Sequence, residues 1–324
     1  MNILRFAKNW TLPLAIMTGS AFYFMFARVP ALQPAAAIFG PAFDVLFPLS
    51  VFFTLLATFS KVDFHHMRPA RWQLVVSLLQ IFFAAIVVAL VAVARLQGES
   101  RLLAEAALTC IIAPCASAAP VVTGKLGGNL HQMTLYVLLS SLMASVVIPL
   151  LFPLLERTAD VGFFSAFLHI LQRLFVVIIL PLGLGWVVRH YVPPLYRFVV
   201  AHADLPFYLW AFSLTITTGI TVRNIVHAQA SARLIGLIAL GALAVCLVQF
   251  AAGRMVGRRS GHTVEAGQGL GQKNTAMAIW VTSVYLHPVA SLGPGCYVLW
   301  QNLVNSYELW KKRRNDNTTL QKNS

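Results

Sequence analysis

The stretch Cys110-Ile-Ile-Ala-Pro-Cys-Ala-Ser-Ala-Ala-Pro-Val-Val-Thr-Gly-Lys125 decides the fold, because it places two prolines inside an apolar run long enough to cross a bilayer. Proline removes a backbone donor and clashes with the preceding helical turn. A helix interrupted at membrane depth is tolerated only where protein or water satisfies the released carbonyls, so this segment is expected to line a cavity. The alternative is an ordinary proline kink that neighbouring helices fill.

A second interruption is predicted at Gly267-Gln-Gly-Leu-Gly-Gln-Lys-Asn-Thr275, which is too polar and too rich in glycine for a helix that faces lipid. Two interrupted segments, each the fourth span of a five-span half, are typical of transporters built from inverted repeats, whose binding site lies near the membrane midplane. The N-terminal ends of such half-helices favour anionic groups, whereas free carbonyls and side-chain amides coordinate a cation.

The composition makes the bilayer the solvent of this chain. Of 324 residues, 58% are hydrophobic and only 10% are charged, with a mean hydropathy of +0.75, whereas a soluble protein has roughly a quarter of its residues charged. We assign the net charge of +14 to the cytoplasmic ends of membrane spans and expect no nucleic-acid partner, which would require a basic face on a polar surface. The four cysteines lie in apolar segments and predict neither disulfides nor a zinc site.

Ten membrane spans are predicted, each a predominantly apolar run of about 20 residues between charged or turn-forming residues. They lie near residues 10–27, 35–58, 72–94, 102–124, 130–154, 162–188, 204–222, 233–252, 263–285 and 287–309. The fold class is therefore an all-α membrane protein with an inverted five-plus-five repeat. The first half covers residues 1–156 and the second 157–310, and a basic, polar tail without regular structure follows at 311–324.

Positive charges predict the orientation of the spans. Of the 24 Lys and Arg residues, 16 fall on the side of the termini, six fall opposite, and Arg173 and Lys273 lie within spans. The positive-inside rule then places both termini in the cytoplasm. The N-terminus runs into the first span without a cleavage site for a signal peptide, so we expect a multi-pass protein of the cell membrane.

The chain resembles the bile acid:sodium symporter family. The resemblance is carried by Lys61-Val-Asp63-Phe, Gln80, the 114–129 crossing with Gly127-Gly128-Asn129, the Gly271-Gln-Lys-Asn274 crossing, and the segment His287-Pro-Val-Ala-Ser-Leu-Gly-Pro-Gly-Cys-Tyr-Val-Leu-Trp-Gln-Asn302 through Asn305. It implies a panel of spans 1–2 and 6–7 facing a core of spans 3–5 and 8–10, with substrate bound between them beside the two crossing helices.

The resemblance also implies two sodium sites, but the match to them is partial. Gln80 and Asn274 fit the family pattern. Gly269, however, stands at the family's glutamate, Lys273 at its glutamine, and Ala119-Pro120 at its Ser-Asn pair. The fifth-span hydroxyls of Thr134 and Ser140 do not align cleanly, and Glu265 lies one helical turn before the carboxylate position. An alternative alignment equates Glu265-Ala-Gly-Gln268 with the motif.

These departures suggest that the Lys273 ammonium replaces a bound sodium ion, pointing at Gln80, Asn274 and carbonyls of the interrupted fourth span. An intramembrane charge is a functional candidate by default. The alternatives left open are proton coupling through Lys273, residual sodium coupling, and a lysine whose head reaches water. No metal site and no cofactor are predicted. The candidate coupling site is Lys273, Gln272, Asn274, Gln80 and Glu265, and the candidate substrate contacts are Ser117, Ala119, Pro120, Thr123, Thr275, His287 and Asn302.

The predicted function is secondary transport of small organic anions, either bile-acid-like or keto and hydroxy carboxylates, by a monomer in the lipid bilayer. An enzyme would need a nucleophile with its base, a metal cluster or paired carboxylates, and none is legible in the sequence. The alternatives are a sodium-coupled symporter of organic anions and, from another class, a channel or sensor. Saturable counterflow would separate a carrier from a channel.

Overall fold

The computed structural model describes residues 10–63, 67–155, 168, 172 and 175–322, and this part of the chain is helical without a β-strand. The all-α prediction is confirmed. Its elements are α2 (Thr11–Arg28), the 3₁₀ turn η1 (Pro30–Leu32), α3 (Gln33–Phe59), α4 (Arg71–Val93), α5 (Gly98–Ile112), α6 (Ala119–Lys125), α7 (Leu130–Leu155), the π-helical turn η3 (Phe175–Ile179), α9 (Leu180–Tyr191), α10 (Pro193–Ala201), α11 (Leu205–Val226), α12 (Ala232–Arg258), α13 (Thr263–Gly271), α14 (Thr275–Tyr285), the 3₁₀ turn η4 (Pro288–Ser291) and α15 (Leu292–Lys322).

Local sequence explains several helix ends. Pro120 occupies the first turn of α6, where a missing N–H costs no hydrogen bond. Ser231 caps α12 by accepting a hydrogen bond from the backbone of Leu234 at 3.2 Å. Gly127 adopts a φ of 85° after α6, a conformation that residues with a Cβ rarely take. The chain can therefore turn sharply between α6 and α7.

Five helices of the described chain are long and apolar enough to cross a membrane: Phe39–Phe59, Arg71–Val93, Leu130–Phe152, Leu205–Val226 and Ala232–Arg258. The predicted fourth and ninth spans divide into α5 and α6 and into α13 and α14, each too short to cross a bilayer of about 30 Å alone. Much of the predicted sixth span, with Arg173, lies outside the described residues. On α4, Leu78 and Phe82 remain more than half exposed, as expected of side chains that face lipid.

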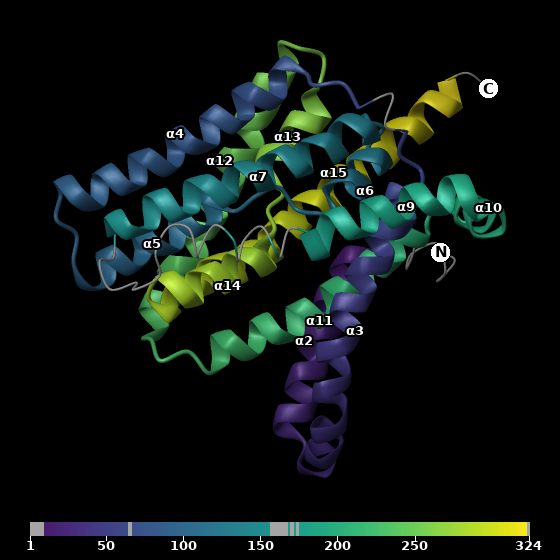
Figure 1. Cartoon of the computed structure of the whole chain (residues 1–324). Helices are drawn as coiled ribbons and strands as arrows, with labels where there is room; N and C mark the ends of the chain where they lie inside the picture. The colour runs from purple at the N-terminus through teal and green to yellow at the C-terminus, as the bar shows by residue number, and fades with distance from the viewer. Residues whose placement is uncertain (1–9, 64–66, 156–167, 169–171, 173–174, 323–324) are drawn as a thin grey trace.

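The helices form two groups that are visible in Figure 1. In one group α11 packs along α2 and α3, and α9 packs against α3. In the other, α12 packs against α5, α13 and α15, while α4 packs against α5 and α7. Glycines allow the closest approaches: a Cβ at Gly19 of α2 would overlap the carbonyl oxygen of Thr215 on α11.

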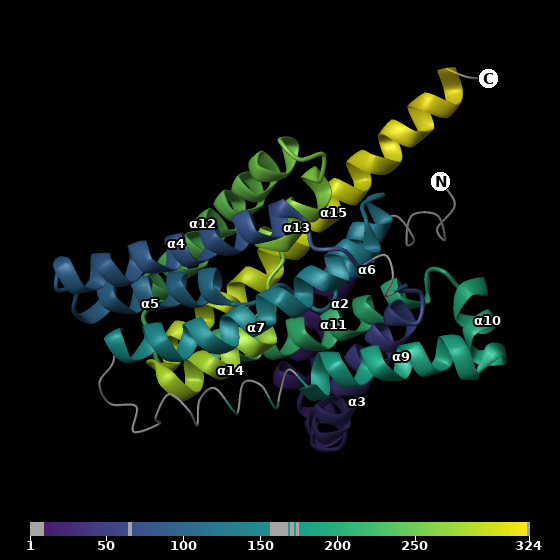
Figure 2. The same ribbon diagram turned by 45° about the horizontal axis from the view of Figure 1, so that its top comes forward.

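One element departs from the prediction at the C-terminal end of the chain. The predicted tail at 311–324 has helical structure as far as Lys322, because α15 continues through it and projects beyond the other helices (Figure 2). A hydrogen-bonded ion pair one turn apart, Lys312 to Asp316 at 3.0 Å, supports the extension. The prediction of a tail without regular structure is therefore wrong up to Lys322.

Candidate functional site

Two interrupted helices meet in the middle of the second group of helices. The first interruption separates Ile112 at the end of α5 from Ala119 at the start of α6, and the second separates Gly271 at the end of α13 from Thr275 at the start of α14. Both lie where the sequence predicts them, so the prediction of two broken helices is confirmed.

The two connecting segments run antiparallel and pair through their backbones. The N–H of Ala116 donates to the carbonyl of Gln272 at 2.8 Å, and the N–H of Asn274 donates to the carbonyl of Pro114 at 2.8 Å. Between these bonds, Cys115 and Lys273 form an antiparallel bridge. Backbone groups freed by each break thus find partners in the other break, as the membrane interior requires. We call residues 113–118 and 272–274 together the crossover.

Side chains cap the C-terminal end of α5. Nζ of Lys273, which is only 1% exposed, donates to the carbonyl of Ile111 at 3.0 Å. Nε2 of Gln80 on α4 donates to the carbonyls of Ile112 and Ala113 at 3.1 and 3.0 Å. The last carbonyls of a helix have no partner within it and carry the negative end of its dipole. A cation is therefore well placed at this helix end.

Polar residues of α12 and α15 that are not among the predicted site residues also form hydrogen bonds with the crossover and the helix ends beside it. Gln249 donates to the carbonyl of Cys110 at 3.3 Å, and the hydroxyl of Tyr297 donates to the carbonyl of Gly271 at 2.7 Å. Gln301 donates to the carbonyl of Lys273 at 3.2 Å and accepts from its N–H at 2.7 Å. An amide inside a long apolar helix was the available signal, since such residues usually bond to another helix.

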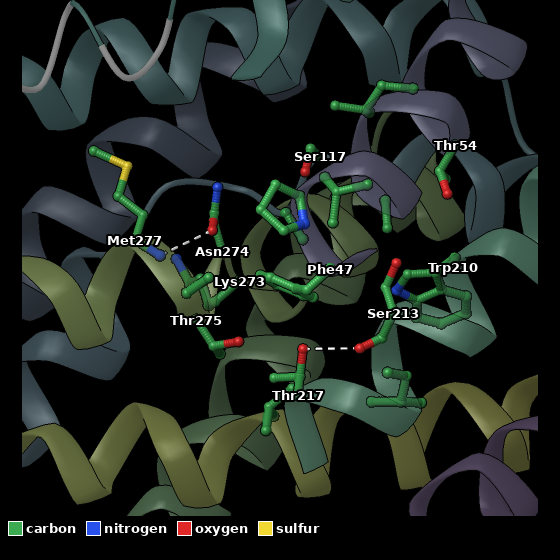
Figure 3. A pocket seen from close by; sticks show the side chains of 18 of the residues that line it. Phe47, Thr54, Ser117, Trp210, Ser213, Thr217, Lys273, Asn274, Thr275 and Met277 are labelled. Carbon is green, nitrogen blue, oxygen red and sulfur yellow. Dashed lines mark hydrogen bonds between the residues drawn. The ribbon is translucent and has the colours of Figure 1, made fainter. Parts of the chain in front are cut away.

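A cavity of about 500 Å³ lies beside the crossover (Figure 3). This volume is within the usual range for sites that bind small molecules. It is lined from eight places in the chain: α3, both segments of the crossover, α7, η3, α11, α14 and α15. The lining residues are Phe47, Pro48, Leu49, Val51, Phe52, Thr54, Leu55, Ala116, Ser117, Ala118, Ser141, Val176, Ile178, Trp210, Ser213, Leu214, Thr217, Gln272, Lys273, Asn274, Thr275, Ala276, Met277, Val298, Gln301 and Asn302.

The cavity has two unlike walls. The wall from α3, η3 and α11 is mainly apolar, with large side chains such as Phe47 and Trp210, although Ser213 and Thr217 add hydroxyl groups. The opposite wall is formed by the crossover with α14 and α15, and it includes Lys273 and the amide residues Gln272, Asn274, Gln301 and Asn302. Among the described lining residues, Lys273 is the one with a charged side chain.

The structure brings six of the predicted site residues to this cavity. They are Ser117, Gln272, Lys273, Asn274, Thr275 and Asn302. Asn274 uses its side-chain oxygen to cap α14, accepting from the N–H of Met277 at 3.1 Å. Gln80 binds the carbonyls at the C-terminal end of α5 and does not line the cavity.

Five other predicted residues lie elsewhere. Ala119, Pro120 and Thr123 are buried in α6, outside the cavity lining. His287 is exposed and accepts from the N–H of Val289 at 3.2 Å, as the cap of η4. Glu265 accepts from the N–H of Asn129 at 2.6 Å, next to the start of α7. Glu265 therefore supports the junction of α6 and α7.

Comparison with known proteins gives a family. The model of the sodium bile acid symporter family matches residues 45–255, which is more than half of the chain. A search of curated proteins finds no match. Together with the long apolar helices, the family match identifies a multi-pass transporter in a membrane. The chain belongs to the sodium bile acid symporter family.

Proposed function

We propose that this protein transports small organic anions by alternating access without sodium coupling, and that the ammonium of Lys273 takes the place of a bound cation. One observation carries the proposal: Nζ of Lys273 lies 3.0 Å from the carbonyl of Ile111 at the C-terminal end of α5. Free carbonyls at the ends of broken helices are the groups that coordinate the cation in transporters with discontinuous helices. A covalently attached cation would stabilise the crossover at all times.

The remaining side chains fit bound sodium poorly, and this supports the proposal. At the three positions where the family supplies most of its sodium oxygens, Gly269, Ala119 and Pro120 have no side-chain oxygen. The carboxylate of Glu265 is committed to the N–H of Asn129. A sodium ion beside Nζ of Lys273 would also be repelled by a like charge at short range.

The cavity chemistry supports an organic anion as the substrate. The N-terminal end of α14 reaches the cavity at Thr275 and carries the positive end of the helix dipole. It adds to the positive charge of Lys273 on the same wall. Aromatic side chains such as Phe47, Phe52 and Trp210 on the facing wall suit an apolar body. Bile-acid-like anions and keto or hydroxy carboxylates share this division into an anionic head and an organic body.

The proposal includes the arrangement of the chain in the membrane. Residues 1–156 and 157–310 form two inverted five-span halves of a monomer. The panel is made of α2, α3, η3 with α9, and α11, and the core of α4–α7 and α12–α15. Both termini face the cytoplasm, and the membrane is the cell membrane. The contacts within each group of helices, and the position of the cavity between them, support this division.

A second candidate is a sodium-coupled symporter of organic anions. It is favoured by the family match and by Gln80 and Asn274, which keep the family's residues at two sodium-site positions. The two candidates differ in one measurable property, the dependence of transport on external sodium.

The test is uptake of labelled taurocholate, pyruvate and 2-oxoglutarate into proteoliposomes in sodium or choline buffer. We expect saturable uptake of at least one anion, equal in the two buffers, and loss of that uptake in Lys273→Gln. The same substitution at the exposed Lys311 is the control and should leave uptake unchanged. Strict sodium dependence of the unmodified protein would favour the symporter. Flux without saturable counterflow would indicate a channel.

A further inference from the structure

We infer that the carrier exchanges monovalent anions one for one, with the substrate serving as the counter-ion of Lys273. This inference rests on the proposed function, and it adds a stoichiometry and a mode of transport. It begins from a charge imbalance: Lys273 is 1% exposed and has no carboxylate partner among the described residues.

Carboxylates near the helix bundle are committed to other groups. Glu105 pairs with Arg101 at 2.8 Å, Glu308 pairs with Arg254, and Glu265 accepts from the backbone of Asn129. None of these residues lines the cavity. Within the described wall of the cavity, the single fixed charge is therefore positive. One bound monovalent anion makes this site neutral, whereas a divalent anion leaves one negative charge.

The apolar wall from α3, η3 and α11 explains why the net charge of the binding site affects the carrier's change of orientation. Alternating access requires the crossover to shift relative to α3, η3 and α11, whose cavity wall is dominated by aromatic and aliphatic side chains. An ammonium that is bound only to the carbonyl of Ile111 and has no anion beside it is unfavourable near such a surface, and an ammonium paired with an anion is far less so. The loaded carrier should therefore change its orientation readily, and the empty carrier should do so slowly.

Two consequences follow for transport. Because the carrier changes its orientation mainly when it is loaded, each anion carried inward must be exchanged for one anion carried outward. Because the loaded site is neutral and the return step also carries one anion, the cycle moves no net charge. Exchange should therefore be insensitive to the membrane potential and selective for monovalent over divalent anions.

The experiment measures two fluxes of labelled taurocholate and pyruvate into proteoliposomes with the unmodified protein. One set of vesicles contains the same unlabelled anion, and the other contains potassium sulfate. We expect uptake to be at least about tenfold faster into the preloaded vesicles, given the cost of an unpaired lysine in a membrane interior. A potential set by potassium and valinomycin should not alter that rate, and 2-oxoglutarate should exchange more slowly than either monovalent anion.

Several results would overturn the exchange inference and leave the transport proposal standing. They are equal uptake into both sets of vesicles, acceleration by the membrane potential, faster exchange of the dianion, and net accumulation driven by an inward proton gradient. If none of the three anions crosses in either mode, the transport proposal is wrong and this inference falls with it. In Lys273→Gln, if the variant elutes as a folded protein, exchange into the preloaded vesicles should fall to the rate in protein-free vesicles.

Discussion

The side chain of Gln301 holds the main chain of Lys273 on both sides: its Oε1 accepts from the N–H at 2.7 Å and its Nε2 donates to the carbonyl at 3.2 Å. Lys273 belongs to no helix, so its backbone groups need partners from elsewhere in the protein. Gln301 on α15 thus fixes the residue whose ammonium caps α5. The position of the charge depends on a neighbouring helix as much as on the crossover itself.

Replacing Gln301 with leucine should destabilise the protein, because the N–H of Lys273 loses its partner, whereas the carbonyl of Lys273 still accepts from the N–H of Thr275 at 3.0 Å. We expect a cost of about 1–3 kcal/mol for the N–H left unsatisfied. Gln301→Glu keeps the acceptor oxygen and should lie between the leucine variant and the unmodified protein. Thermal unfolding in detergent measures the order. Equal midpoints for all three proteins would show that Gln301 does not support Lys273.

Two glycines of α12 should respond to alanine in opposite directions. A Cβ at Gly253 would overlap the carbonyl oxygen of Ala266, whereas a Cβ at Gly241 meets no atom within 4 Å. Gly253→Ala should force α12 and α13 apart and cost about 1–3 kcal/mol. Gly241→Ala should leave stability unchanged or raise it by up to about 1 kcal/mol, through helix propensity. Denaturant unfolding of both variants in micelles tests the difference, and similar losses would contradict the close packing.

Thiol labelling should map the cavity without removal of the native cysteines. Cys110, Cys115, Cys246 and Cys296 are at most 3% exposed, so the unmodified protein should react slowly with a membrane-impermeant thiol reagent. A cysteine introduced at Ser117 lines the cavity and should react faster, with protection by any transported anion.

Ser140→Cys is the matched control for this labelling. Ser140 is fully buried and accepts a hydrogen bond from the N–H of Cys115 at 2.9 Å. The variant should remain as unreactive as the native thiols. Rapid labelling of Ser140→Cys, or no labelling of Ser117→Cys, would contradict the position of the cavity in the structure.

Two ion pairs involving α15 should contribute very differently to stability. Arg254 binds Glu308, whose side chain is 16% exposed and also accepts from Gln268 at 2.8 Å. Lys312 and Asp316 are 42% and 54% exposed. A double-mutant cycle with alanine should give a coupling above about 1 kcal/mol for the first pair and about 0.2–1 kcal/mol or less for the second. The reverse order would show that the contact between α12 and α15 is not electrostatic.

The sequence predicts the two interruptions because they rest on local chemistry. Pro114 and Pro120 disfavour a continuous helix, and the glycine-rich stretch that ends at Asn274 is too polar to face lipid. The same signals identify the crossover and five residues of the cavity, whereas Asn302 lies on α15. Hydrophobic run length also predicts most helices. It does not predict α10, which has only 9 residues, or the polar extension of α15, because neither contains an apolar run long enough to cross a membrane.

Contacts between distant segments could not be predicted in this way. Nothing in one sequence links Gln249 to Cys110 or Gln301 to Lys273, since the packing of α12 and α15 creates these contacts. Glu265 is predicted beside Lys273 because it lies one helical turn before the carboxylate position that the family resemblance implies. Eight residues of helix would separate such a pair by about 12 Å, and Glu265 instead reaches Asn129.

The antiparallel pairing of the crossover has a mechanical consequence. It ties a strand-like segment from early in the chain to one from late in the chain, and lipid offers no replacement for the backbone bonds between them. Neither segment can slide while the other stays in place. Any rearrangement that opens the cavity to opposite faces of the membrane must therefore displace α5, α6, α13 and α14 as a single rigid block.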